Sequence, residues 1–274
     1  MNQKIIVKLI LIIGIITAIY WVKGTLRLSS DNQPEDFYGK SIYRNINRSN
    51  TDLGAATLII GDSGADQLYT STKSHGKAVS LTTNAAITMA GQYIFLQNAL
   101  KNNDLKKVVL IYNPLSFSNN LDTATSYQYF IKPFYTIENK VYFDTSVNDA
   151  LIPFFLPSLS QLPLIKATNW VPDFSFRLEK STVELSPINK NYLKKISELT
   201  LERGIQFSVL PGMIKESKRN DTFQELRSLI KANGLQDAFK DYFNKMIFLE
   251  DKWFRDEVHV WKMSMIPDDP YQLK

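Results

Sequence analysis

The strongest constraint on the fold is an alternation of short apolar runs with longer helical patterns. The apolar runs are typical of buried strands and fall at residues 56–60, 78–81, 107–112, 205–210 and 245–249. The helical patterns cover residues 65–71, 85–102, 187–204, 222–232 and, more briefly, 235–244. Strands that alternate with helices build a parallel sheet, so we predict an α/β fold with three layers (α/β/α) and a parallel five-stranded sheet.

Composition excludes several classes of protein and site. The 274 residues are 44% hydrophobic and 22% charged, which excludes a disordered chain, collagen and a polytopic membrane protein. The net charge of +5 comes from scattered basic residues, so no nucleic-acid partner is predicted. The absence of cysteine excludes thiol chemistry, and two histidines, His75 and His259, cannot form a multi-histidine metal centre. We therefore expect no cofactor and no metal.

The N-terminal segment is apolar from Ile5 to Val22 except for Lys8, close to the shortest length that crosses a bilayer as a helix. No small-x-small cleavage site follows it, so we predict an uncleaved transmembrane anchor at residues 1–24 in preference to a cleaved signal peptide. We place the N-terminus in the cytoplasm and the domain outside, which makes a single-pass membrane protein of the bacterial cell envelope.

The remaining chain divides into a tether and one domain. Residues 25–52 are polar without a sustained period and are interpreted as a tether, and residues 53–274 as the α/β domain. An insertion at about residues 114–187 is rich in Phe, Tyr and Pro, and its aromatic side chains either form core or line a sugar-binding cleft. His75 lies in a Lys- and Ser-rich stretch and is expected to be a solvent-exposed turn residue.

Chemistry in such a fold lies at the carboxyl ends of the strands, where two motifs occur. Gly61-Asp62-Ser63 follows the first strand, and Ser63 lies where a strand passes into a helix. Asp256 precedes His259 by three residues after the last strand, so the carboxylate can accept the Nδ1 hydrogen and leave Nε2 as a base. These residues predict a Ser63–His259–Asp256 triad, although Ser63 as a plain helix cap remains the alternative.

On these two motifs the chain resembles the SGNH (GDSL-like) hydrolase superfamily over about residues 55–260. The resemblance implies a flavodoxin-like arrangement of the sheet and an oxyanion site made by the Ser63 N–H, a backbone N–H near Asn84 and Ala85, and the Asn113 side chain. The chain departs from the family pattern in three places. No glycine follows the second strand, and Asn113 is followed by Pro instead of completing a Gly-x-Asn-Asp motif. After His259, Pro267 and Pro270 discourage the family's usual final helix.

The resemblance also implies a function: a serine-dependent esterase (acyl-ester hydrolase) or O-acyl (acetyl) transferase that acts on a cell-surface carbohydrate through an acyl-serine intermediate. The family branch that it suggests contains membrane-anchored polysaccharide O-acetyltransferases and esterases. The alternative is a catalytically inactive SGNH-like envelope module that binds glycan or a protein partner. A phosphate site at the Gly61 turn is not favoured, since no Gly-rich loop with a following Lys is present.

Overall fold

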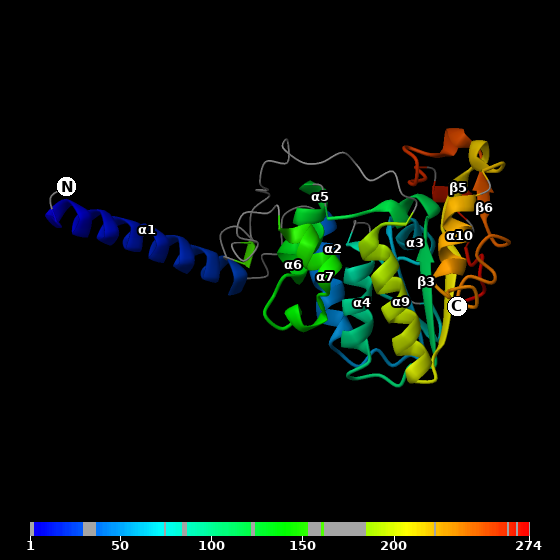
Figure 1. The fold of residues 1–274 in the computed structure, drawn as a ribbon, viewed down its shortest axis with the longest axis horizontal. Helices are drawn as coiled ribbons and strands as arrows, with labels where there is room; N and C mark the ends of the chain where they lie inside the picture. Colours follow the sequence, from blue (N-terminus) through cyan, green and yellow to red (C-terminus); the bar gives the residue numbers. More distant parts are fainter. Residues whose placement is uncertain are drawn as a thin grey trace.

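The computed structural model describes residues 3–29, 37–73, 75–83, 87–121, 124–152, 160–161, 185–221, 223–261, 263–266 and 268–273 (Figure 1). The strands are β1 (Thr57–Gly61), β2 (Ala78–Ser80), β3 (Lys107–Tyr112), β4 (Gln206–Pro211), β5 (Met213–Lys215) and β6 (Ile247–Leu249). The longer helices are α1 (Gln3–Ser29), α2 (Phe37–Ser49), α3 (Ser63–Leu68), α4 (Thr88–Ala99), α7 (Thr145–Leu151), α9 (Pro187–Glu202) and α10 (Gln224–Ala232). Short helical turns are η1 (Pro114–Ser118), α5 (Ala124–Ser126), η2 (Tyr127–Ile131), α6 (Lys132–Phe134), η3 (Lys140–Tyr142), η5 (Glu216–Lys218), η6 (Asp251–Trp253) and η7 (Met263–Met265).

The predicted mixed α/β architecture with a parallel sheet is confirmed. Four strands pair in the order β2-β1-β3-β4, all parallel, and β3 covers the predicted residues 107–112. Side chains alternate across this sheet, as they must in strands. On β1, Leu58 and Ile60 join the larger core cluster with α4, α9 and α10, while Ile59 joins the smaller cluster with α3 and the C-terminal segment. Both faces of the sheet are thus covered.

The predicted single five-stranded sheet is wrong, because the main sheet has four strands. The fifth predicted strand exists as β6, but it pairs in parallel with β5 in a separate two-stranded sheet. Strand β5 continues the path of β4 after Gly212 and has no counterpart among the predicted strands. Pro211, the last residue of β4, pairs with Tyr112, the last residue of β3, so the ladder ends where β3 gives way to η1.

The interpretation of residues 25–52 as a tether is also wrong for much of its length. Helix α1 continues to Ser29, and α2 occupies residues 37–49 and packs against α4. Ile42 in α2 is buried in the larger core cluster. Ile46, one turn further on, packs against the same cluster, and Ser41, Asn45 and Ser49 are buried beside them, so the inner face of α2 mixes apolar and polar residues.

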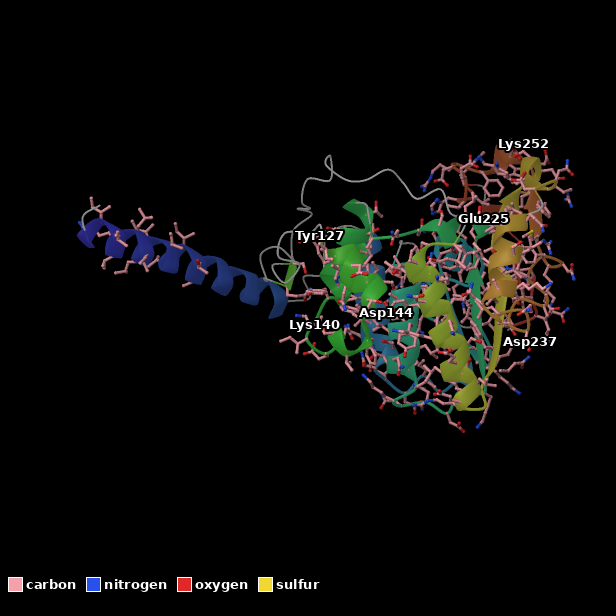
Figure 2. All side chains as sticks on the ribbon, in the orientation of Figure 1. Tyr127, Lys140, Asp144, Glu225, Asp237 and Lys252 are labelled. Atoms are coloured by element: carbon pink, nitrogen blue, oxygen red, sulfur yellow. The ribbon has the colours of Figure 1, made fainter. Side chains whose placement is uncertain are left out.

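The N-terminal apolar segment forms helix α1. Its apolar side chains from Ile5 to Ile16 are exposed, and Figure 2 shows drawn side chains of α1 projecting both above and below the helix. Within the ranges that the structure describes, no helix combines the length and apolar character needed to span a membrane. The transmembrane anchor predicted at residues 1–24 therefore has no support from the structure.

Two further expectations concern the insertion and His75. Described aromatic side chains of the insertion, among them Tyr127, Phe130 and Phe134, are buried in the larger core cluster, in agreement with the core alternative. Residues 153–159 and 162–184 lie outside the described residues. The exposed turn expected at His75 is wrong: the side chain is 3% exposed and its Nε2 lies 2.8 Å from the Thr70 carbonyl oxygen.

Candidate active site

The Gly61-Asp62-Ser63 turn is built into the sheet where β1 passes into α3. A Cβ atom on Gly61 would lie 2.1 Å from the Ile111 carbonyl oxygen and 2.5 Å from the Ala65 Cβ, so a side chain does not fit there. The close approach of β1, β3 and α3 thus requires this glycine. Ser63 follows as the first residue of α3 and is partly exposed.

Asp62 is a structural residue in this turn. It caps α3 by accepting a hydrogen bond from the Ala65 N–H, and its Oδ2 accepts another from the Asn113 N–H at 2.9 Å. Burial raises the pKa of the Asp62 carboxyl, and hydrogen bonds from Ser116 and from the backbone N–H groups around it oppose this effect only in part. Asp62 fixes Ser63 at the helix start, which agrees with a cap and not with a catalytic acid.

Asn113 lies in the same corner, at the carboxyl end of β3, with a side chain that is 1% exposed. Its Nδ2 donates to the Met213 carbonyl at 2.9 Å, and its Oδ1 accepts from the Leu115 N–H at 3.0 Å. The structure therefore brings Asn113 to the Ser63 turn but uses part of its amide to hold the loop after β4. One Nδ2 hydrogen is not taken by Met213, and the oxyanion role stays a prediction.

Asp256 and His259 form the predicted pair. Both Asp256 carboxylate oxygens lie 2.8 Å from His259 Nδ1, and Asp256 Oδ1 also accepts from the Val258 and His259 backbone N–H groups. Partial burial raises the pKa of Asp256, but these hydrogen bonds outweigh it and lower the pKa to about 2. An ionised carboxylate can only accept, so neutral His259 carries its hydrogen on Nδ1 and has a free electron pair on Nε2.

The pair lies in a short loop whose two sides are joined. Phe254 and Val260 form an antiparallel bridge, and the Arg255 N–H donates to the His259 carbonyl at 2.7 Å. Phe254 and Val260 are buried in the smaller core cluster, whereas the His259 side chain at the loop tip is 22% exposed. The loop is thus anchored at its base and presents the imidazole to solvent.

Gln67 joins this loop to the helix that begins at Ser63, a link that sequence reasoning missed. Its Nε2 donates to the Val260 carbonyl at 2.7 Å, and its Oε1 accepts from the Val260 N–H at 3.1 Å. Gln67 follows Ser63 by four residues, so both lie on the same face of α3. The residue after His259 is therefore fixed one helical turn from Ser63. The only sequence signal was this spacing on a predicted helix.

Not every part of the predicted site is brought together. Within the described part of the chain, no hydrogen bond joins the Ser63 hydroxyl to the His259 ring, as is common in sites without substrate. Asn84 and Ala85, the predicted backbone donors, lie outside the described residues. Among the described residues, no three His, Asp or Glu side chains are grouped so that they could hold a metal ion.

Comparison with known proteins assigns no family or function to the chain. No family model matches the chain, and no curated protein or solved structure is significantly similar to it. The resemblance to the SGNH hydrolases therefore remains a prediction that rests on the residues and the geometry described above.

Proposed function

We propose that the protein is a serine-dependent acyl-ester hydrolase or O-acyl transferase of the SGNH type. Its substrate class is an acylated carbohydrate of the bacterial cell surface. The observation that carries the proposal is the Asp256–His259 pair, which Gln67 fixes beside the helix that begins at Ser63. The strand order β2-β1-β3-β4 supports it, since doubly wound flavodoxin-like sheets begin with the same order.

The proposed reaction has two steps, acylation of Ser63 and transfer of the acyl group from Ser63, and His259 moves a proton in both. His259 Nε2 takes the Ser63 hydroxyl proton while Oγ attacks the ester carbonyl carbon, and the imidazolium returns this proton to the leaving alkoxide. The acyl-Ser63 ester is then attacked by water or a carbohydrate hydroxyl, whose proton passes to His259 and then to Ser63. Asp256 stays ionised and stabilises the imidazolium; the Ser63 N–H and the Asn113 amide are the proposed oxyanion donors.

The proposal is tested with the full-length chain in mild detergent. We expect hydrolysis of a small aryl acetate, or acetyl transfer to an oligosaccharide, and covalent labelling of Ser63 by a fluorophosphonate. A Ser63→Ala variant should lose turnover by at least about a thousandfold and lose labelling. Ser228→Ala is the matched control, because Ser228 is an exposed serine on α10.

The proposed activity is contradicted if the folded wild-type chain shows neither turnover nor labelling, with acetylated glycans among the substrates. Equal loss in Ser228→Ala would also contradict it, since that variant leaves the proposed site unchanged. Circular dichroism of each variant separates loss of chemistry from loss of fold.

The second candidate function is an inactive SGNH-like module that binds glycan or a protein partner. The engaged amide of Asn113 favours it, as does the lack of a hydrogen bond between Ser63 and His259 among the described residues. This candidate predicts that the wild type is unreactive and that Ser63→Ala binds acetylated glycan as tightly as the wild type does.

The proposed location is the bacterial cell envelope, with the apolar side chains of α1 holding the domain at a membrane. Ile10, Ile12 and Ile16 in α1 are exposed, and apolar side chains in such a stretch favour lipid over water. The full-length chain should float with phospholipid vesicles, and an Ile12→Asp/Ile16→Asp double variant should remain in the soluble fraction. Equal flotation of the two chains would contradict this location for α1.

A further inference from the structure

A basic pocket lies at the opposite end of the sheet from Ser63. It has a volume of about 610 Å³, and its lining includes Arg44, Arg48, Ser71, Thr72, Lys73 and Gly76. It also includes Ala55 before β1 and Ala78 at the start of β2, so it lies at the amino ends of these strands. Ser63 follows the carboxyl end of β1, and the pocket is therefore separate from the candidate active site.

Neutral groups hold the two arginines of this pocket in place. Arg44 and Arg48 lie four residues apart on α2 and so project from the same face of the helix. Arg44 Nη2 donates to the Ser71 hydroxyl at 3.2 Å, while Arg48 Nη1 donates to the carbonyls of Ser71 at 2.6 Å and Ser80 at 3.2 Å. These contacts fix both guanidinium groups without neutralising their charge.

Among the described residues, no carboxylate is in salt-bridge contact with these cations, although Asp66 acts on Arg44 at longer range. Across the described ranges, no ion pair reaches Arg44, Arg48 or Lys73. Asp66 acts electrostatically on Arg44, but its Oδ1 is occupied by the Ser71 N–H and the Thr82 hydroxyl. Arg44 Nε is buried and has no hydrogen-bond partner. Burial and the charge of Arg44 both lower the pKa of Arg48, which shows how close the two cations are.

We propose that this pocket binds the phosphate group of a small phosphorylated ligand. Arg44 and Arg48 contribute two guanidinium groups to the lining, and the exposed Lys73 supplies a third cation. Guanidinium groups match the oxygens of phosphate in a bidentate manner. The Ser71 hydroxyl accepts from Arg44 and so keeps its own hydrogen for a ligand oxygen.

The number of donors and the volume define the ligand further. Three cations carry more positive charge than one carboxylate neutralises, whereas a phosphate monoester has three terminal oxygens and up to two negative charges. A volume of about 610 Å³ is within the range of pockets that hold whole small molecules, so the ligand extends beyond the phosphate group itself.

Calorimetric titration of the full-length chain at constant ionic strength tests the site. The probes are inorganic phosphate and glycerol 3-phosphate, with acetate as the carboxylate comparison. We expect saturable binding of both phosphates, tighter for glycerol 3-phosphate, and much weaker binding of acetate. Arg44→Gln and Lys73→Gln should each weaken phosphate binding about tenfold or more, the effect of losing one charge-assisted hydrogen bond.

Arg203→Gln is the matched control, since Arg203 is an exposed arginine at the end of α9 and its loss changes the net charge equally. The Lys73 variant keeps the test independent of folding, because Lys73 is exposed and makes no side-chain hydrogen bond among the described residues. The proposal is overturned if the wild type binds neither phosphate, if acetate binds as tightly, or if Arg203→Gln weakens binding as much. Ser63→Ala should bind phosphate unchanged, which separates this site from the proposed esterase activity.

Discussion

The two halves of the candidate active site are built differently. The Ser63 half lies where β1, β3 and α3 meet, and its neighbours Asp62 and Asn113 are buried and hydrogen-bonded to each other. The His259 half lies at the tip of a loop, where Asp256 is 44% exposed. The nucleophile's position is therefore part of the core, whereas the base is held by local hydrogen bonds and by Gln67. Substitutions in the first half should act mainly on stability, and those in the second mainly on activity.

The largest expected effect is in the loop. Asp256→Asn should lower kcat about 10⁴-fold, as loss of the orienting carboxylate does in triad enzymes, because it no longer favours the productive His259 tautomer. The thermal midpoint should fall only slightly, since an amide oxygen can still accept from the Val258 and His259 N–H groups, although more weakly than the ionised carboxylate with its lowered pKa. Kinetics with an aryl acetate and a melting curve measure both quantities. A large fall in the thermal midpoint would contradict the proposed difference between the Ser63 half and the His259 half of the site.

The next effect concerns the buried turn. Gly61→Ala should destabilise the fold by about 3 kcal/mol, because its Cβ would overlap the Ile111 carbonyl oxygen. Gly204→Ala is the control: Gly204 has a φ of +65° and no atom within 4 Å of its Cβ position, so only backbone strain of about 1 kcal/mol is expected. Urea unfolding compares the two. Equal costs would show that the turn is not tightly packed.

Gln67 connects the halves, and its removal tests the connection. Gln67→Ala should lower kcat/KM about tenfold, or about 1.4 kcal/mol, because the loop that carries His259 loses its two hydrogen bonds to α3. Fluorophosphonate labelling of Ser63 should slow by a similar factor. Gln97→Ala is the control, since Gln97 lies on α4 and contacts Tyr93. Unchanged kinetics in Gln67→Ala would mean that the loop is positioned without this residue.

The smallest effect is a pH dependence in the buried half. Because burial raises the pKa of Asp62, its folded state binds a proton more tightly than the unfolded chain. Stability from this group is thus full below the unfolded pKa of about 4 and falls as pH rises through the raised folded value. Asp62→Asn should cost about 1 kcal/mol near pH 4 through the lost acceptor for Asn113, and less at higher pH.

Urea midpoints of Asp62→Asn and wild type across this pH range measure that difference. Over the same range Asp256 stays ionised, because its pKa is lowered to about 2. A cost that grows with pH would contradict the sign derived for Asp62.

Local patterns in the sequence predicted the four strands of the main sheet, β6 and the Asp256–His259 pair. Strand β3 is a continuous apolar run in the middle of the sheet, and Asp256 meets His259 within one turn of the chain. Contacts made at long range were not predictable in this way. Gln67 and Val260 are 193 residues apart, and nothing in either segment indicates the pairing.

Burial of polar residues explains the remaining differences. Helix α2 buries Ser41, Asn45 and Ser49, and His75 is buried in a stretch whose neighbours are polar. Composition indicates solvent exposure for such segments, while the structure buries them with hydrogen bonds, such as that from Asn45 Nδ2 to the Thr82 carbonyl at 2.7 Å.

The break in the ladder at Pro211 and Gly212 has a consequence for how the molecule opens. Beyond it, β5 and β6 hydrogen-bond to each other and not to the four-stranded sheet, so the C-terminal part that carries His259 can lose its amide protection without disrupting β1 to β4. Hydrogen exchange should then be faster at Ile247–Leu249 than at Lys107–Tyr112. In mild denaturant, the segment that carries His259 would unfold first, while Ser63 stays in place at the end of the intact sheet of β1 to β4.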